Sequence, residues 1–494
     1  MSDLTHAFLA ADTARRAELL GDADTTSALR RYLGDAAFAD LQRVGARAAA
    51  SEHLGIKSPP NLVFVPGVMG SLLYSKTRGG VRWLNFDTLK MMNGLALDDA
   101  GTDDADAANR IEPFTVDVSY EPFASAVLAR EDFGHEMFAY DWRKMYSEST
   151  RALRDLIFAM HKKNGGLKVH IVAHSMGGLM TRATLKEYGE LWDVVGRIAF
   201  IGTPHYGSAS IAGYLKNHLS GFEKLTLLAK FLSRETFRSL WGVLSLLPAP
   251  AGVYPGSRPG EPFATPAKGA GHKLGYAHPC ANFNLYDAEA WDLGLDATAT
   301  TRLQTVLDAV KAFHLDLYRW HNDPAELLQD HCDKMLMVAG VGYKSLFRME
   351  YVDKLGGLWT SMEKTTSRVD GDPHRDSDGR VPIASARLER VRLKYVKGVH
   401  GGLTNIPAVC TDVFRWLKGE RMTLLADTPE DALGGHLSAA TAESEAPNLD
   451  GSAGAHDDDP GYLDLDASST LDLDQAEQRI ASGAVPGFNL LKIL

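Results

Sequence analysis

The sequence has few cysteines and no long apolar run. Its three cysteines, Cys280, Cys332 and Cys410, are odd in number and widely spaced, which is a poor basis for a disulfide framework. No segment reaches the roughly 20 uninterrupted apolar residues that a membrane-spanning helix needs. The first residues lack a basic stretch followed by an apolar one, so we expect no secretory signal and a cytoplasmic protein with reduced thiols.

An excess of basic residues is also missing, since the net charge is −11. Residues 421–494 hold 14 of the 63 acidic residues but 3 of the 52 basic ones, so residues 1–420 are neutral overall. Nucleic-acid binding requires a clustered basic face, and we expect none. Metal-ligand spacings such as His-Glu-x-x-His and phosphate-binding glycine fingerprints are absent from the sequence, so we expect neither a metal nor a cofactor.

Short strand-like runs alternate with helical stretches from residue 60 onward. The predicted strands cover residues 61–65, 136–140, 168–173, 197–201, 335–339 and 392–396. This alternation predicts an α/β fold with a mostly parallel, doubly wound sheet. We divide the chain into a helical N-terminal extension (1–57), the first part of the core (58–206), an inserted helical cap or lid (207–330), the second part of the core (331–420) and an acidic, mobile C-terminal tail (421–494).

Two segments outside the core leave alternatives open. In the cap, residues 225–232 and 237–248 have helical apolar spacing, which suits packing on the core or a lid that contacts a membrane surface. In the tail, acidic and apolar residues alternate at 463–466 and 471–474, which suits a solvated segment or a site for a protein partner.

Residues 169–178 read VHIVAHSMGG, an apolar run followed by a tight turn of small residues. Such a turn projects a serine as a nucleophile, and Ser175 stands at its apex. The pattern departs from Gly-x-Ser-x-Gly at Ala173, which adds one methyl group. Taken alone, Ser175 could be a helix N-cap. We expect the neighbouring His174 to shape the turn rather than to act as the base.

A serine nucleophile of this kind needs an acid and a histidine that follow it along the chain, each after a later strand. Asp378 lies in a DGRVP segment after the strand at 335–339, and His400 lies between glycines after the strand at 392–396. We therefore predict Ser175, Asp378 and His400 as the catalytic residues. Asp372 and Asp376 in the same acidic loop are alternatives for the acid.

The oxyanion of acyl transfer needs two backbone amides. One is predicted at Met176, directly after the nucleophile. The other is predicted at Val68, in the loop that follows the first strand and its Pro66-Gly67 pair.

Seven segments together resemble the lecithin:cholesterol acyltransferase-like family, which includes lysosomal phospholipase A and phospholipid:diacylglycerol acyltransferases. They are residues 65–73, 83–85, 139–143, 173–178, 201–208, 378–382 and 400–402, in the family's order. The resemblance implies an α/β-hydrolase fold with a cap and lid, an acyl-enzyme on Ser175, and hydrogen bonds from Arg143 under the site. On the same grounds we expect Trp83, Trp241 and Tyr206 to contact the substrate.

These observations predict a serine hydrolase that cleaves acyl esters of lipids, of the phospholipase or lipase type. Its substrate is then a lipid or another apolar ester, with peripheral membrane contact through the cap. Three alternatives stay open: a lipid acyltransferase that uses the same intermediate, a small-ester or polyester esterase, and an effector subunit that its acidic tail recruits to a protein partner.

Overall fold

The structure is a computed structural model. It describes isolated positions between 4 and 42 and the following ranges: 18–33, 60–83, 93–216 (without 129 and 131), 233–259, 278–280, 284–354 (without 344), 357–365 and 377–434. In the predicted N-terminal extension, one helix is described, α3 (Ala23–Leu33). The predictions for residues 225–232, for Asp372 and Asp376, and for the tail beyond residue 434 lie outside the described residues.

A six-stranded parallel sheet forms the centre of the molecule, in the order β11-β8-β7-β6-β1-β5. Its strands are β1 (Pro60–Val65), β5 (Gly134–Met137), β6 (Val169–His174), β7 (Val195–Ile201), β8 (Met335–Val341) and β11 (Arg392–Lys397). All six overlap the strands predicted from the sequence. The parallel sheet and its flanking helices confirm the predicted α/β-hydrolase fold.

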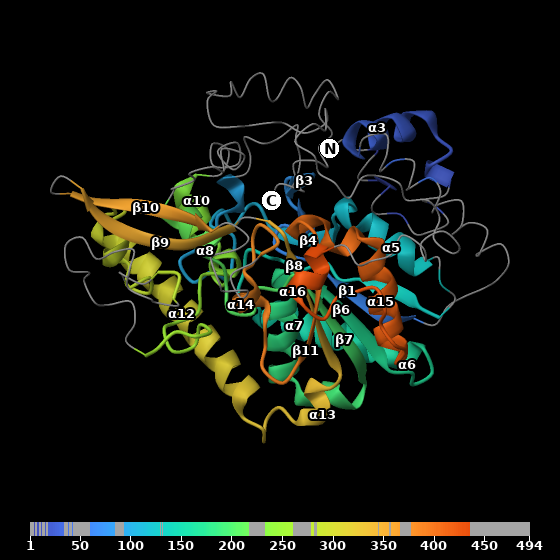
Figure 1. Cartoon of the computed structure of the whole chain (residues 1–494). Coiled ribbons are helices and arrows are strands. Elements are labelled where there is room, and N and C mark those ends of the chain that lie inside the picture. Colours follow the sequence, from blue (N-terminus) through green and yellow to red (C-terminus); the bar gives the residue numbers. More distant parts are fainter. Residues whose placement is uncertain are drawn as a thin grey trace.

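Helices cover both faces of this sheet (Figure 1). They are α6 (Ser147–Lys163) and α7 (Met176–Glu187) on one face, and α5 (Glu121–Leu128) and α15 (Pro407–Lys418) on the other. The alternation of side chains along β1 explains this. Val63 and Val65 pack in the cluster with α6 and α7, whereas Leu62 and Phe64 pack in the cluster with α5 and α15.

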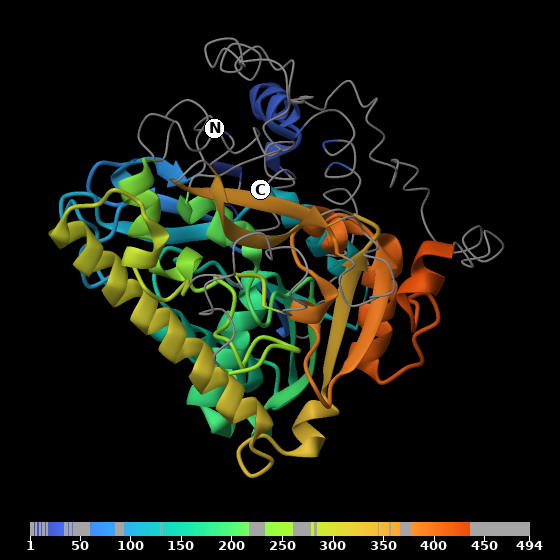
Figure 2. The same cartoon turned by 60° about the vertical axis from the view of Figure 1, so that its left-hand side comes forward.

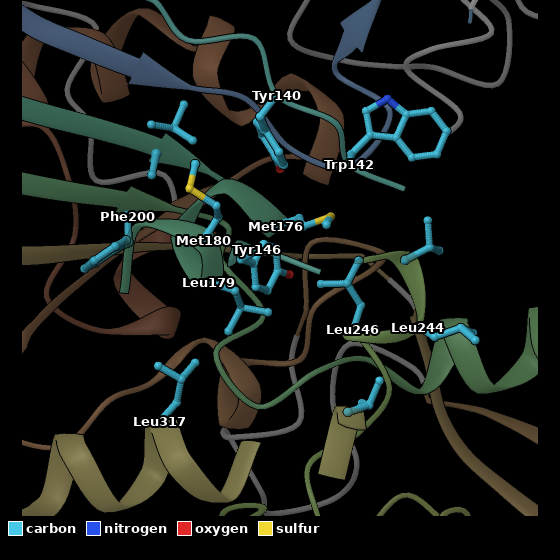
Figure 3. Packing of buried hydrophobic residues seen from close by; sticks show 14 of the residues in the cluster. Tyr140, Trp142, Tyr146, Met176, Leu179, Met180, Phe200, Leu244, Leu246 and Leu317 are labelled. Carbon is cyan, nitrogen blue, oxygen red and sulfur yellow. The ribbon is translucent and has the colours of Figure 1, made fainter. Parts of the chain in front are cut away.

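Helix α7 is buried along most of its length, which fixes the turn before it. Figure 3 shows Met176, Leu179 and Met180 lying between Tyr140 on one side and Leu317 on the other. Leu317 belongs to α12 (Ala297–Asn322), the long helix that runs along one side of the molecule in Figure 2. The first turn of α7 is therefore held from two directions by packed side chains.

The segment predicted as a cap contributes several helices to the structure. They are α8 (Ala209–Lys216), α10 (Arg234–Arg238), α11 (Trp241–Leu244), the 3-10 helix η4 (Glu289–Trp291) and α12. Ser233 and Asp296 begin α10 and α12, where each side chain accepts a hydrogen bond from a backbone N–H of the first turn. The boundaries 207 and 330 stay a prediction.

Two antiparallel units were not predicted from the sequence. One is a small sheet of β3 (Val81–Trp83), β2 (Ser71–Ser75) and β4 (Ile111–Val116). The other is the hairpin of β9 (Ser345–Lys354) and β10 (Gly357–Thr365), the orange pair at the left of Figure 1. The remaining short elements are η2 (Val118–Tyr120), η3 (Gly189–Asp193), α13 (Gln329–Cys332), α14 (Ile383–Ala386), η6 (His400–Asn405) and α16 (Pro429–Gly434).

The first residues of the segment predicted as a tail contact the core, and its boundary at 421 stays a prediction. The buried carboxylate of Asp412 accepts hydrogen bonds from the backbone amides of Leu424 and Leu425, at 2.7 and 2.8 Å. Ala426 and Tyr395 exchange backbone hydrogen bonds at the edge of the sheet. These contacts attach residues 421–426 to the core. The acidic composition of the whole segment gave no indication of them. Of the helices in the described part, none is long and apolar enough to cross a membrane.

Candidate active site

Ser175 lies at the turn between β6 and α7 with a backbone conformation that non-glycine residues rarely adopt. Its φ is 52° and its ψ is −127°. A positive φ at a serine is strained, and the surrounding core must hold it. The Ser175 amide donates to the carbonyl oxygen of Ile201 at 2.9 Å, which extends the pairing of β6 with β7 to the turn itself. The strain and its support are those of a nucleophile elbow.

The two glycines after Ser175 are required by close approach. A Cβ atom on Gly177 would lie 2.4 Å from the carbonyl oxygen of Pro66, and one on Gly178 would lie 2.1 Å from Oγ1 of Thr203. Both distances are below any real contact, so only hydrogen fits at either position. Helix α7 thereby starts directly against the ends of β1 and β7.

The structure brings Ser175, His400 and Asp378 together, although 225 residues separate the first two. Oγ of Ser175 lies 2.8 Å from Nε2 of His400, and Nδ1 of His400 lies 2.7 Å from Oδ2 of Asp378. Ser175 and Asp378 are almost fully buried, and the His400 side chain is 11% exposed. The three side chains thus lie in one hydrogen-bonded series, which is the arrangement expected of a nucleophile, a base and an acid.

The Asp378 carboxylate is positioned from both sides. Its Oδ1 accepts hydrogen bonds from the backbone amides of Arg380 and Val381, at 2.9 and 2.7 Å. The backbone amide of His400 donates to the Asp378 carbonyl oxygen at 2.9 Å. The carboxylate therefore has one oxygen satisfied by its own loop and the other turned to the imidazole.

Aromatic side chains hold the loop between β1 and β2, where an oxyanion donor was predicted. The hydrogen bonds run from Tyr140 Oη to Pro66 O (3.1 Å), from Gly67 N to Tyr120 Oη (3.0 Å), from Trp83 Nε1 to Met69 O (2.8 Å) and from Trp142 Nε1 to Ser71 O (3.0 Å). Among the described residues, no acceptor takes the amide hydrogen of Val68 or of Met176. Both amides are therefore available as the predicted oxyanion donors.

Arg143 is fully buried among charged and polar partners. Its guanidinium donates to both carboxylate oxygens of Asp141, to Asp104 at 2.7 Å and to the carbonyl oxygen of Leu95. Burial alone disfavours the charge, but the two carboxylates outweigh it and raise the pKa of Arg143. The ion group links residues 95–104 to the segment that follows β5, and its role under the site stays a prediction.

A pocket of about 600 Å³, counted with its open mouth, begins at Ser175 and His400. Its walls are mostly apolar and come from the β1–β2 loop, the segment after β7, α8, α10, α11 and the Asp378 loop. The lining side chains are Val68, Met69, Pro204, Ser208, Ser210, Ile211, Tyr214, Phe237, Val243, Leu246, Arg380 and Val381. Apolar walls with a few polar groups are typical of ligand pockets.

The three residues predicted to contact the substrate do not line this pocket. Trp83 is fully buried and supports Met69, and Tyr206 is 6% exposed within the core. Trp241 packs against the core and faces Gly101. Their contact with substrate stays a prediction. The lining of this pocket comes from neighbouring positions such as Ser208 and Val243, which only the tertiary packing brings together. In the described part, no three His, Cys, Asp or Glu side chains gather as metal ligands.

A family model for lecithin:cholesterol acyltransferase matches residues 130–265, which contain β6, the Ser175 turn and α7. This part of the chain is therefore similar to the lecithin:cholesterol acyltransferase family, whose members are enzymes of the esterase or acyltransferase type.

The solved structures that resemble this chain are remote from it in sequence. The Tle4-Tli4 complex shows 16% identity over 73% of this chain and 98% of that chain, with a TM-score of 0.48. The mature form of the Bacillus licheniformis lipase BlEst2 shows 15% identity over 70% of this chain and 87% of that chain, with a TM-score of 0.29. A comparison with curated proteins gave no match.

Proposed function

We propose that the chain hydrolyses acyl esters of lipids through an acyl-enzyme on Ser175. The observation that carries this proposal is the Ser175, His400 and Asp378 series at the base of an apolar pocket. The apolar walls suit the fatty acyl chain of a phospholipid or an acylglycerol, with the ester carbonyl at the serine.

In the proposed reaction, Nε2 of His400 takes the proton of Ser175 Oγ as the oxygen attacks the carbonyl carbon. Asp378 holds the Nδ1 hydrogen of His400 and stabilises the imidazolium. The amides of Val68 and Met176 bind the oxyanion, and His400 then protonates the leaving alcohol. Water, deprotonated by His400, attacks the acyl-enzyme and releases the fatty acid and the serine.

Labelling with a fluorophosphonate probe tests the nucleophile. We expect one probe per wild-type chain and none on Ser175→Ala, and we expect fatty-acid release from phospholipid vesicles to disappear with the label. Ser210→Ala is the matched control, because Ser210 lines the same pocket and its hydroxyl has no hydrogen-bond partner among the residues that the structure describes. Equal labelling or equal release by Ser175→Ala and wild type would refute the proposal.

A lipid acyltransferase is the second candidate, because the matching family model is that of an acyltransferase. Both reactions share the acyl-enzyme and differ in what resolves it. Adding a long-chain alcohol to the vesicle assay separates them. Esterified alcohol in place of free fatty acid would identify transfer, and unchanged fatty-acid release would identify hydrolysis.

A further inference from the structure

A second series of buried hydrogen bonds runs beside the proposed catalytic residues. The amide of Gly67 donates to Oη of Tyr120 at 3.0 Å, and Tyr120 Oη lies 2.8 Å from Nδ1 of His174. Nε2 of His174 lies 3.1 Å from the carbonyl oxygen of His400. Tyr120 and His174 are both almost fully buried. The series joins two segments that the Ser175–His400–Asp378 hydrogen bonds do not connect.

The chemistry of the end groups sets the direction of each hydrogen bond. The Gly67 amide can only donate, and the His400 carbonyl oxygen can only accept. Nε2 of His174 therefore carries the hydrogen, Nδ1 is an acceptor, and the Tyr120 hydroxyl donates to it. Burial, followed by the charge of His400, lowers the pKa of His174 to about 3, which keeps this single neutral tautomer. Burial also raises the pKa of Tyr120, so its proton stays in place.

The two ends of the series are parts of the proposed chemistry. Gly67 precedes Val68, whose amide is the proposed oxyanion donor, and His400 is the proposed base. His174 itself precedes Ser175, and its ring lies 5.0 Å from the ring of His400, centroid to centroid. The imidazole of His174 is thus linked to the donor loop through Tyr120 and bonds directly to the backbone of His400, while the next residue in the chain is Ser175.

Other side chains hold the same loop but do not extend to the base. Tyr140 and Trp83 bind the carbonyl oxygens of Pro66 and Met69 and anchor the loop to the core. They fix the loop relative to the sheet. The path through Tyr120 and His174 fixes it relative to His400, and this is the separation that acyl transfer depends on.

We propose that Tyr120 and His174 are positioning residues that hold the oxyanion loop and His400 at a set separation across Ser175. The proposal rests on the proposed function. The two residues then act as one unit, because removing either side chain breaks the hydrogen-bonded series between the loop and His400.

A double-mutant cycle tests this coupling. The variants are Tyr120→Phe, His174→Phe and the pair together, assayed on a short-chain chromogenic ester and corrected for folded fraction by thermal unfolding. We expect kcat to fall about 10- to 100-fold in each single variant with KM changed less than about threefold, since misplacement by about 1 Å costs about 100-fold. The double variant is expected to lose no more than the worse single variant.

Two further variants keep the test decisive. Tyr146→Phe removes a buried hydroxyl that bonds to Ser245 and not to the loop. Its kcat per folded molecule should equal that of the wild type, even if the substitution lowers the stability. His174→Gln retains a donor and an acceptor and should recover part of the kcat lost in His174→Phe. If Tyr120→Phe does not fold, the pair His174→Phe and His174→Gln still measures the contribution of the hydrogen bonds.

Losses of kcat that multiply in the double variant, an effect on KM alone, or wild-type kcat in His174→Phe would each overturn the proposal. The failure of the proposed function looks different. If wild-type protein has no activity that depends on Ser175, that function fails. If Ser175-dependent activity is present and the Tyr120 and His174 variants match wild type, the positioning role alone fails.

Discussion

The substitution Asp378→Asn separates the geometry of the candidate site from its charge. In the wild type, Oδ1 of Asp378 accepts two backbone amides and Oδ2 faces Nδ1 of His400 at 2.7 Å. An asparagine must keep its oxygen toward the two amide donors, because its NH₂ group cannot face them. The NH₂ group then points at Nδ1 of His400 and forces that nitrogen to accept.

The consequence for His400 is a change of tautomer. With Nδ1 as acceptor, Nε2 carries the hydrogen and presents N–H to Oγ of Ser175, so it cannot take the serine proton. We expect kcat to fall about 10⁴-fold, as in other serine enzymes of this type, which corresponds to about 5 kcal/mol of barrier. The KM for a short-chain ester should change little, since the pocket walls are untouched.

Steady-state hydrolysis of a chromogenic ester, with unfolding curves to check the fold, measures this loss. Asp412→Asn is the matched control, because Asp412 is equally buried and accepts backbone amides far from the site. It should cost stability and leave kcat per folded molecule unchanged. Asp372→Asn and Asp376→Asn should keep kcat within about threefold. An Asp378→Asn enzyme with a tenth or more of wild-type kcat would refute the reasoning, and a 10⁴-fold loss in Asp376→Asn or Asp372→Asn would move the acid there.

Three further predictions concern the pocket, the turn and pH. Val243→Trp should fill the pocket and lower kcat/KM for long-chain esters relative to an acetyl ester, and an unchanged chain-length profile would contradict an acyl pocket there. Gly178→Ala should cost about 1–3 kcal/mol in denaturant unfolding because of the contact with Thr203, whereas Gly189→Ala, with open space around it, should not; equal stabilities would contradict the packing argument. Burial lowers the pKa values of five histidines to about 3 or 4, whereas the value in the unfolded chain is about 6.5. Below pH 6.5 the unfolded chain binds protons that the folded protein does not, so the folded protein loses stability as the pH falls from 6.5 toward 4. The free energy of unfolding, measured from pH 7 to 4, should fall by on the order of 1 kcal/mol per pH unit for each of these histidines, and a flat profile would contradict their burial. The five residues are His170, His174, His278, His314 and His321.

The central sheet was predictable because each of its strands is a short apolar run bounded by turn residues. Buried parallel strands have this pattern, and it depends on the local sequence alone. The small sheet was missed because β2 begins and ends with serine and β3 is only three residues long. Ser71 and Ser75 are nevertheless buried, with their hydroxyls hydrogen-bonded to backbone atoms of distant segments. Such partners cannot be read from a local pattern.

Ser175, Asp378 and His400 were proposed together because the order and context of α/β-hydrolase residues are visible in the sequence. The pocket walls and Tyr120 were not, because they depend on which side chains meet after folding. Tyr120 lies 54 residues before its partner His174 and carries no motif of its own. Trp83 is a similar case, because its burial and the hydrogen bond from its indole N–H to the carbonyl oxygen of Met69 could not be foreseen from the local sequence.

Two histidines in contact have opposite electrostatic requirements at this site. In the proposed reaction His400 becomes positively charged in the transition state, while His174 lies 5.0 Å away, ring centroid to ring centroid. A second positive charge at that distance would cost about 3 kcal/mol at an effective dielectric constant of about 20, or roughly 100-fold in rate. The burial that lowers the pKa of His174 to about 3 keeps its ring neutral near pH 7 and so removes this repulsion. A neutral, buried imidazole at position 174 therefore serves the chemistry in two ways, because it can hold the His400 backbone without opposing the charge that forms on the His400 ring.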